Sequence, residues 1–122
     1  MKFDPDLMRA ILLDAETIPA GQSVAGFEYA EREQKEVNRH TQILIDEGYL
    51  EGSWKGDSKN FPALFYITDL TYQGHQFLAN ARNQTVWSRA LNIAKEKGLE
   101  TSISAISAIL LKVATSYGVE GA

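Results

Sequence analysis

The sequence predicts an α+β fold that is mostly helical and contains one small antiparallel sheet. Three observations predict it. Apolar residues recur at helical spacing in five segments, and two runs of strand-forming residues, Leu50–Trp54 and Ala63–Leu70, stand in the middle of the chain. A turn-rich stretch, residues 55–60, separates these two runs. A chain of 122 residues buries roughly two-thirds of the surface that its unfolded form exposes, which is enough for a core without disulfides.

Composition narrows the function classes. Twelve Lys and Arg against sixteen Asp and Glu give a net charge of −4, which disfavours a protein whose main task is to neutralise phosphates but leaves room for a local basic face. The absence of cysteine removes disulfides, thiolate nucleophiles and cysteine-ligated zinc, and we expect a cytoplasmic protein. Arg9 and Asp14 interrupt the first apolar run, so we expect no signal peptide.

The first helix is predicted from Asp4-Pro5 to about Glu16. Asp caps free backbone N–H groups, and Pro is tolerated at the first helical position. The residues after it, 18–25, are typical of a loop, and the alternation of Phe27 and Tyr29 about Glu28 predicts a short strand with its aromatic rings inward. The helix is expected to bury Leu7, Met8, Ile11 and Leu12.

A second helix is predicted over Glu33–Glu47, and the rest of the chain is expected to pack around it. Gly48 ends it, because glycine takes the left-handed conformation at low cost, and Tyr49 and Leu50 then return to the core. The apolar stripe is Val37, Thr41, Leu44 and Ile45. The opposite, mostly solvent-facing side carries Gln34, Lys35, Asn38, Arg39 and Gln42.

Three more helices follow the predicted hairpin. Thr71 caps a helix from Tyr72 to about Asn83. Gln84-Thr85 starts another, which runs to Lys97 and is ended by Gly98. The last begins near Thr101-Ser102.

The last helix is unusually apolar, with Lys112 as its only charge. It is too short and too rich in serine for a membrane span, which needs roughly 20 apolar residues. We expect it to be buried in its own domain or against a second subunit, and predict a homodimer. The predicted interface residues are Ile103, Ile106, Leu110, Val113 and Tyr117.

The segment from Glu33 to Trp54 resembles the third helix and first wing strand of winged-helix proteins. This resemblance implies that residues 1–82 form a winged helix-turn-helix-like core with a wing of two or three strands. Residues 83–122 are then a helical extension that packs on this core or forms a dimer interface. A helix-turn-helix needs another helix before Glu33, and so few residues remain there that this helix must be very short or missing.

The polar side of the second helix is the candidate DNA-binding site. Its amide and cationic side chains are types that reach base edges and phosphates from a major-groove helix, and Lys55 and Lys59 at the wing tip suit the DNA backbone. An ordinary solvated helix face is the alternative, because residues 31–59 hold five Lys and Arg against seven Asp and Glu. The helix contributes Gln34, Lys35, Asn38, Arg39 and Gln42 to the candidate site.

No catalytic motif is present, and we expect neither enzymatic activity nor a cofactor. His40 and His75 leave two interpretations: a metal site completed by Glu36 or Glu47, or histidines that hydrogen-bond locally. We predict no metal. Trp54 and Trp87 are expected to anchor the core or an interface.

Three runs, DLMRAILL (6–13), VNRHTQILIDEGYL (37–50) and LTYQGHQFLANAR (70–82), together with Val86-Trp87, resemble domain-of-unknown-function family 2513, a family of small bacterial and bacteriophage proteins. The resemblance implies no catalytic residues. It suits a DNA-binding regulator encoded by a phage or prophage, with a protein-interaction module of winged-helix fold as the alternative. The family's C-terminal part is usually lysine-rich, so the single lysine here favours self-association.

Overall fold

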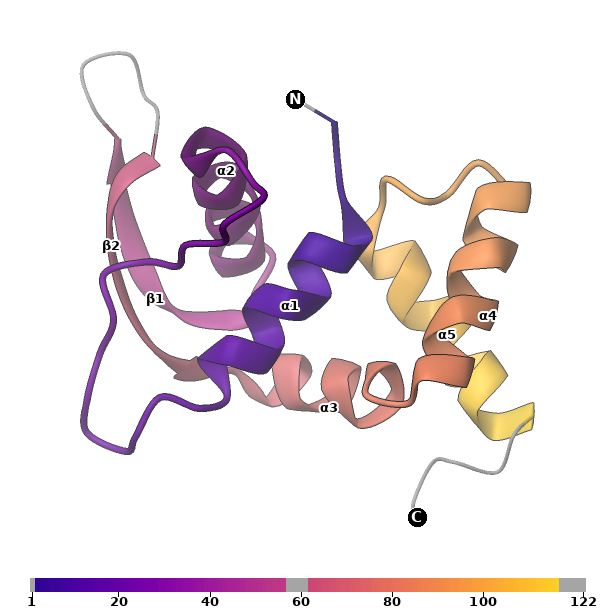
Figure 1. Cartoon of the computed structure of the whole chain (residues 1–122). Coiled ribbons are helices and arrows are strands. Elements are labelled where there is room, and N and C mark those ends of the chain that lie inside the picture. Colours follow the sequence, from indigo (N-terminus) through magenta and orange to yellow (C-terminus); the bar gives the residue numbers. More distant parts are fainter. Residues whose placement is uncertain (1, 57–61, 117–122) are drawn as a thin grey trace.

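The computed structural model describes residues 2–56 and 62–116. Figure 1 shows α2 beside the two-stranded ribbon, α1 crossing the middle, α3 joining the two sides, and α4 and α5 at the far side. This arrangement confirms a mostly helical α+β fold with one antiparallel sheet. The elements are α1 (Pro5–Ala15), α2 (Gln34–Asp46), β1 (Leu50–Gly56), β2 (Pro62–Leu70), α3 (Tyr72–Ala81), α4 (Gln84–Glu96) and α5 (Ile103–Ser116).

The N-terminus of α1 is capped as predicted. The Asp4 carboxylate accepts a hydrogen bond from the Leu7 backbone N–H at 3.1 Å, and Pro5 stands at the first helical position. Ala15 joins the buried face that the sequence predicted. That face is Leu7, Met8, Ile11, Leu12 and Ala15.

A glycine ends α2 where the sequence placed it. Gly48 has φ +84°. The backbone N–H of Gly48 donates to the Ile45 carbonyl at 3.1 Å and that of Tyr49 donates to the Leu44 carbonyl at 2.8 Å, which is the Schellman pattern. Tyr49 and Leu50 are buried directly after this turn, so the turn fixes where the ribbon begins.

The ribbon pairs β1 and β2 antiparallel, from Leu50 opposite Leu70 to Gly56 opposite Pro62. One further segment contacts the sheet. Val24 forms a single isolated bridge with Ile67 of β2, with hydrogen bonds of 2.9 and 3.0 Å.

The predicted strand at Phe27–Tyr29 is wrong, because side chains hold this segment away from the ladder. Gly26 turns the chain with φ +138°, and the Gln34 side chain donates to the Phe27 carbonyl at 2.9 Å. The Tyr29 hydroxyl donates to the Asp14 carboxylate at 2.5 Å, and burial together with that contact raises the pKa of the phenol. Both rings still pack against the core.

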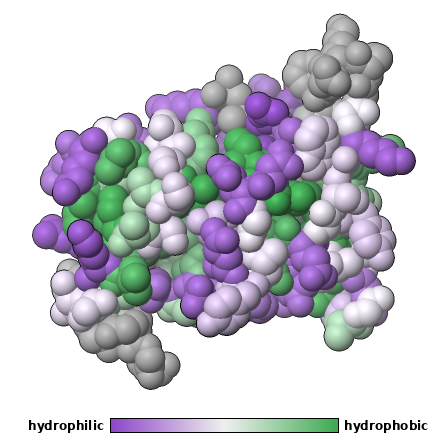
Figure 2. Space-filling model, turned by 180° about the vertical axis from the view of Figure 1, so that it is seen from behind, coloured by the Kyte–Doolittle hydropathy of each residue, from purple (hydrophilic) through white to green (hydrophobic). Residues whose placement is uncertain are grey.

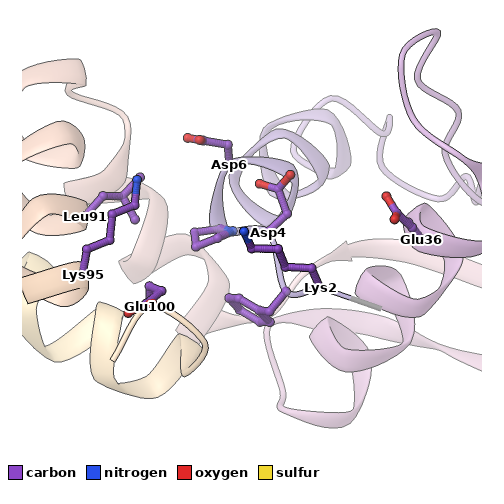
Figure 3. Close-up of a pocket in the computed structure, with 9 residues that line it drawn as sticks. Lys2, Asp4, Asp6, Glu36, Leu91, Lys95 and Glu100 are labelled. Atoms are coloured by element: carbon purple, nitrogen blue, oxygen red, sulfur yellow. The ribbon is translucent and has the colours of Figure 1, made fainter. Parts of the chain in front are cut away.

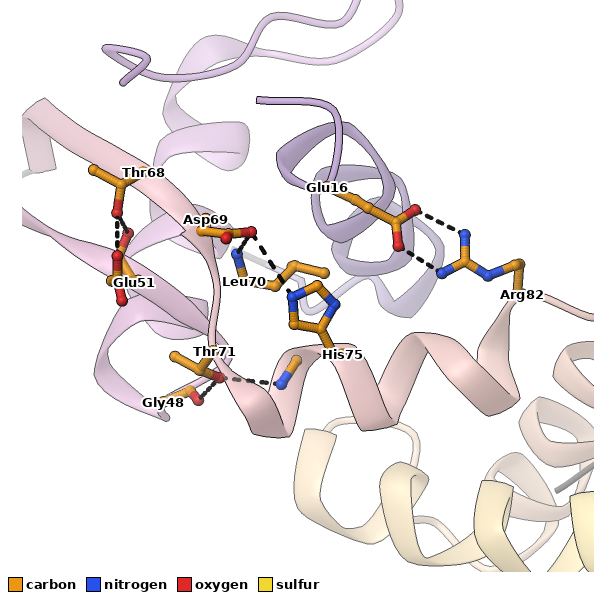
Figure 4. A network of polar contacts seen from close by, with 10 residues as sticks. Glu16, Gly48, Glu51, Thr68, Asp69, Leu70, Thr71, His75 and Arg82 are labelled. Carbon is orange, nitrogen blue, oxygen red and sulfur yellow. Dashed lines mark hydrogen bonds and ion pairs between the residues drawn. The ribbon is translucent and has the colours of Figure 1, made fainter. Parts of the chain in front are cut away.

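The junction after the ribbon holds α3 tightly (Figure 4). Thr71 accepts from the Gly74 backbone N–H at 3.0 Å and donates to the Gly48 carbonyl at 2.5 Å. A Cβ at Gly74 would lie 2.2 Å from the Tyr49 carbonyl oxygen, so only glycine fits there. α4 begins at Gln84, as predicted, and Asn83 caps it by accepting from the Val86 N–H at 3.0 Å.

One hydrophobic core runs through the whole described chain. Phe77 on α3 contacts Tyr49 and Trp87 edge to face, with ring centroids 5.8 and 6.0 Å apart. The Trp87 indole N–H donates to Asp6 of α1 at 2.8 Å, and Arg9 donates to the Ala81 carbonyl at 2.7 Å. Trp87 is therefore a core anchor, and α4 packs on the helices that precede it.

The apolar stripe of α5 lies inside this core. Ile103, Ile106, Leu110 and Val113 are at most 6% exposed, and α5 packs against α4 and α3. Tyr117, the fifth predicted interface residue, lies outside the described residues. The homodimer therefore stays a prediction, and in this fold these four side chains are not on the surface to form it.

The outward side of α5 retains some apolar surface. Leu111 is 55% exposed, and Figure 2, which views the molecule from behind, shows hydrophobic residues in several areas separated by hydrophilic ones. Within the described residues, no helix combines the length and apolarity needed to cross a bilayer.

Candidate nucleic-acid interface

The exposed side of α2 carries a polar row. Gln34, Lys35 and Arg39 are exposed as predicted, whereas Asn38 is half-buried. Gln42 is only 7% exposed, so the prediction that it meets solvent is wrong. Four of the five predicted α2 contacts thus reach the surface to some extent, and they lie in its first two turns.

Two side-chain contacts are made in the second half of α2. Trp54 on β1 reaches across to the end of α2 and donates its indole N–H to Asp46 at 2.9 Å. The Gln42 side-chain oxygen accepts from Arg39 at 2.6 Å. Gln42 therefore orients Arg39, and Trp54 fixes the ribbon to α2; the sequence gives no direct signal for either contact.

The second part of the predicted interface is the ribbon tip. Lys55 is exposed on β1 and pairs in register with Leu64 of β2, whereas Lys59 lies outside the described residues. The same ribbon exposes large apolar side chains, since Leu64 is 66% and Tyr66 is 59% exposed. The ribbon surface therefore combines one described cation, Lys55, with two exposed apolar side chains, Leu64 and Tyr66.

Acidic residues surround the α2 row. Arg32, just before α2, is not available to an incoming phosphate because it forms an ion pair with Asp4. Burial alone would raise the pKa of Asp4, but the hydrogen bonds from Arg32 and the Leu7 N–H and the Arg32 charge lower it overall. Residues 1–82 contain eight Lys and Arg against thirteen Asp and Glu. The cations on α2 therefore belong to a region with an excess of carboxylates.

A shallow pocket of about 330 Å³ adjoins this row. The aromatic rings of Phe27 and Phe65 and the amides of Gln34 and Asn38 line it. The Gln34 amide donates to Asn38 at 2.7 Å as well as to the Phe27 carbonyl, so internal bonds already hold its position. The sequence did not single out this pocket, because Phe27 and Phe65 come from segments far apart in the chain.

The histidines fit the local hydrogen-bonding interpretation. His40 is fully buried; its Nδ1 lies 2.7 Å from the Glu36 carbonyl, and its Nε2 accepts from the Asp4 backbone N–H at 2.8 Å. This pattern requires the neutral tautomer with hydrogen on Nδ1. His75 is exposed, with its Nε2 3.8 Å from Asp69 (Figure 4). Among residues 2–56 and 62–116, no three or more His, Asp or Glu side chains gather as metal ligands would.

Comparison with known proteins gives two matches. A family model described as "Hypothetical protein (DUF2513)" matches residues 2–100, a range that ends before α5. An "Uncharacterized protein" of Haemophilus influenzae (strain ATCC 51907 / DSM 11121 / KW20 / Rd) is 32% identical over 111 residues, which make up 89% of this chain and 92% of that protein. No solved structure matches the chain.

Proposed function

The chain belongs to the family described as Hypothetical protein (DUF2513), and we propose that it is a non-enzymatic DNA-binding regulator that reads duplex DNA with α2. The observation that carries the proposal is the placement of Lys35 and Arg39 on the exposed side of a helix that lies beside an antiparallel ribbon. A helix of this kind fits the major groove, and a cation on the adjacent ribbon contacts the backbone.

The proposal includes a winged-helix-like fold for the part of the chain before α4. Its support is the element order: α1, the strand contact at Val24, α2, and then the β1–β2 ribbon. Val24 forms its bridge with Ile67 of β2. Between α1 and α2, a stretch that the structure describes completely, there is no further helix. The segment with Phe27 and Tyr29 takes that helix's place, so the fold is a reduced form of a winged helix.

Charge sets the expected strength of binding. With Lys35, Arg39 and Lys55 each neutralising one phosphate, the logarithm of the binding constant should fall with the logarithm of salt concentration with a slope of about −3. The surrounding carboxylates repel phosphates, so we expect weak non-specific binding and dependence on base contacts from Gln34 and Asn38. We propose that the protein acts in the cytoplasm as a regulator and is encoded by a bacterium or its phage.

Fluorescence anisotropy tests the proposal. The probes are duplexes tiling the region upstream of the gene, titrated at several salt concentrations with the wild type and Arg39→Ala. Arg89→Ala is the matched control, because Arg89 is exposed on α4 and lies outside the predicted interface. The proposal predicts salt-dependent binding that Arg39→Ala abolishes and Arg89→Ala leaves unchanged. Binding that does not depend on salt, or equal binding by Arg39→Ala and Arg89→Ala, contradicts the proposal.

A second candidate is a protein-interaction module, and the exposed Leu64 and Tyr66 favour it. Apolar side chains in pairs on one strand are more typical of a protein contact than of a DNA backbone contact. A homodimer through this apolar pair, in place of the α5 interface that the sequence predicts, is one form of this candidate. Leu64→Ser with Tyr66→Ser should then lower the apparent mass in sedimentation or lose a protein partner, without changing DNA binding.

A further inference from the structure

An open pocket of about 690 Å³ lies where the N-terminal segment meets the turn between α4 and α5 (Figure 3). Two of its carboxylates already serve the fold, because Asp4 is paired with Arg32 and Asp6 accepts from the Trp87 indole N–H. Its remaining charged residues are equally divided between cations and carboxylates, and the pocket therefore selects neither anions nor cations. They are Lys2, Glu36, Lys95 and Glu100.

The outer edge of β1 has a more specific pattern, because no second strand covers it. The sheet of the described residues has the order β1–β2, and the bridge from Val24 joins β2 and not β1. Among residues 2–56 and 62–116, no backbone hydrogen bond reaches residues 51–56 from outside the ribbon. Alternate N–H and C=O groups along β1 therefore point away from β2, and such a row is a template for a further strand.

This edge is accessible along most of its length. Figure 1 shows the ribbon on the opposite side of the molecule from α4 and α5. All residues of β1 after Leu50 are exposed except Trp54, which is partly buried where it reaches α2. Gly52 has no side chain, so its exposed atoms are backbone atoms. The strand is therefore open to an approaching second strand.

Two charges on the outer face of β1 have no ionic partner. Both register shifts of the ribbon leave their extra residue in β2, so Glu51, Ser53 and Lys55 alternate regularly and share one face. Glu51 accepts from the Thr68 hydroxyl at 2.6 Å, but neither Glu51 nor Lys55 forms a salt bridge with a residue that the structure describes. At a rise of about 3.3 Å per residue the two lie about 13 Å apart, too far to pair with each other.

An antiparallel pairing of β1 with itself satisfies both charges. With a two-fold axis at Ser53, Glu51 lies opposite Lys55 of the second copy, and Lys55 lies opposite Glu51 of that copy. Directly opposite side chains have Cβ atoms about 4.5–5.5 Å apart, within reach of an ion pair. In the adjacent registers, with the axis at Gly52 or Trp54, Ser53 lies opposite one of the charges instead. The charge pattern thus selects one register.

We propose that the edge of β1 is a homodimer interface, in which two copies pair antiparallel about Ser53 and form one sheet with the strand order β2–β1–β1–β2. A lysine on an edge strand usually discourages pairing with another chain. Here Glu51 of the second copy supplies the opposite charge, so the same lysine favours a second copy over other strands. The interface uses neither the α5 stripe nor the exposed Leu64 and Tyr66, which lie on β2.

The dimer has one consequence that rests on the proposed function. The two-fold axis is perpendicular to the sheet, and α2 packs on one face of the ribbon, so both copies of α2 lie on the same side of the dimer. Two such helices read DNA as two half-sites in an inverted repeat. Dimerisation itself is measured without DNA, so the dimer and the DNA-binding proposal can fail separately.

Sedimentation equilibrium on the full chain tests the dimer. We expect a dissociation constant on the order of tens of micromolar, because a single strand edge buries little area. Glu51→Lys and Lys55→Glu each place like charges opposite each other twice, and each should weaken the dimer about tenfold or more. The matched controls are Glu96→Lys and Lys97→Glu, which make the same charge changes at exposed positions on or next to α4 and should leave the dimer unchanged.

Mixing the two β1 variants tests the register. Glu51→Lys has a cation at both positions and Lys55→Glu has a carboxylate at both, so one chain of each restores both ion pairs. An equimolar mixture should therefore associate as the wild type does, although neither variant does so alone. A mixture that stays monomeric contradicts the proposed register.

A disulfide tests the position of the axis. The chain contains no cysteine, so Ser53→Cys introduces a single thiol. Opposite Cα atoms at the axis lie about 4.5–5.5 Å apart, within the range of about 4.4–6.8 Å that a disulfide allows. Mild oxidation should link Ser53→Cys into a dimer but not Ser88→Cys, which is exposed on α4. A wild type that is monomeric up to about 300 µM, undiminished association of Glu51→Lys and Lys55→Glu, or equal cross-linking of the two cysteine variants overturns the proposal.

Discussion

The sequence predicts a DNA-binding surface on α2 and a dimer interface on α5, but the predicted residues of the two helices differ in exposure. α2 keeps Lys35 and Arg39 exposed, whereas α5 buries the four described residues of its predicted interface in the chain's own core. A periodic apolar stripe shows that a face is covered but not what covers it. The polar face left exposed is the better guide to a functional surface.

The two sides of the molecule are also held together differently. Around α2, buried polar groups make specific bonds: Thr41 donates to the Val37 carbonyl at 2.8 Å, and His40 reaches Asp4 across 36 residues of sequence. On α5 itself the buried side chains are all aliphatic, including Ile106 and Leu110. Hydrogen bonds restrict geometry, whereas apolar burial supplies stability, so we expect mutations on the two sides to differ in size.

The largest effect is expected in α5. Leu110→Ala removes a fully buried side chain and should lower the free energy of unfolding by about 2–5 kcal/mol. Leu111→Ala, one residue along and 55% exposed, should change it by no more than about 0.5 kcal/mol. Urea unfolding measures both. Equal effects would mean that α5 does not pack on the core as described.

A smaller effect is expected at His40. His40→Ala leaves the Asp4 N–H without its acceptor and should cost about 1–3 kcal/mol in urea unfolding. His75→Ala is the control, because His75 is exposed with only a distant carboxylate beside it. A neutral result for His40→Ala would show that its hydrogen bond with the Asp4 N–H contributes little to the α1–α2 contact.

Acid should loosen the polar contacts that tie α1 to α2 and α3. Hydrogen bonds from Arg82 at 2.7 and 2.8 Å hold the pKa of Glu16 below its usual 4.5, and the pKa of Asp4 lies below 3.8. Their stabilisation is complete above the unfolded-state pKa values and is lost as pH falls from about pH 5 through the lowered values. Asp4→Asn should make this loss of unfolding free energy shallower; an unchanged pH profile would contradict it.

The smallest effect on stability is expected on the exposed row of α2. Lys35→Ala and Arg39→Ala should each change the free energy of unfolding by no more than about 0.5 kcal/mol, because both side chains are exposed. A thermal melt of each variant measures this. A large loss would assign these residues to the fold and remove them from any binding surface.

Local signals predicted most of the fold, and contacts between distant segments account for the differences. Asp4, Gly48 and Thr71 act on residues within five positions, so their caps and turns could be read from the sequence. The pattern of α2 alone does not reveal that Gln42 is buried, and the covering of α5 depends on α3 and α4. No periodicity in one segment reveals which other segment packs on it.

The candidate sites also divide into one with a local sequence signal and one that depends on contacts between distant segments. The residue types of α2 suggested its exposed row, but the pocket lined by Phe27 and Phe65 has no signature in the sequence. That pocket becomes apparent only when the distant segments that carry Phe27 and Phe65 meet.

Backbone NMR of the full chain, titrated with the duplex that binds most tightly, tests the central claim most directly. We expect the largest shift changes to cluster at residues 34–39 and at Lys55, and α5 to stay unchanged. Changes centred on residues 103–116, or a uniform small change across the chain, would contradict the assignment of α2 as the DNA-reading helix and α5 as core.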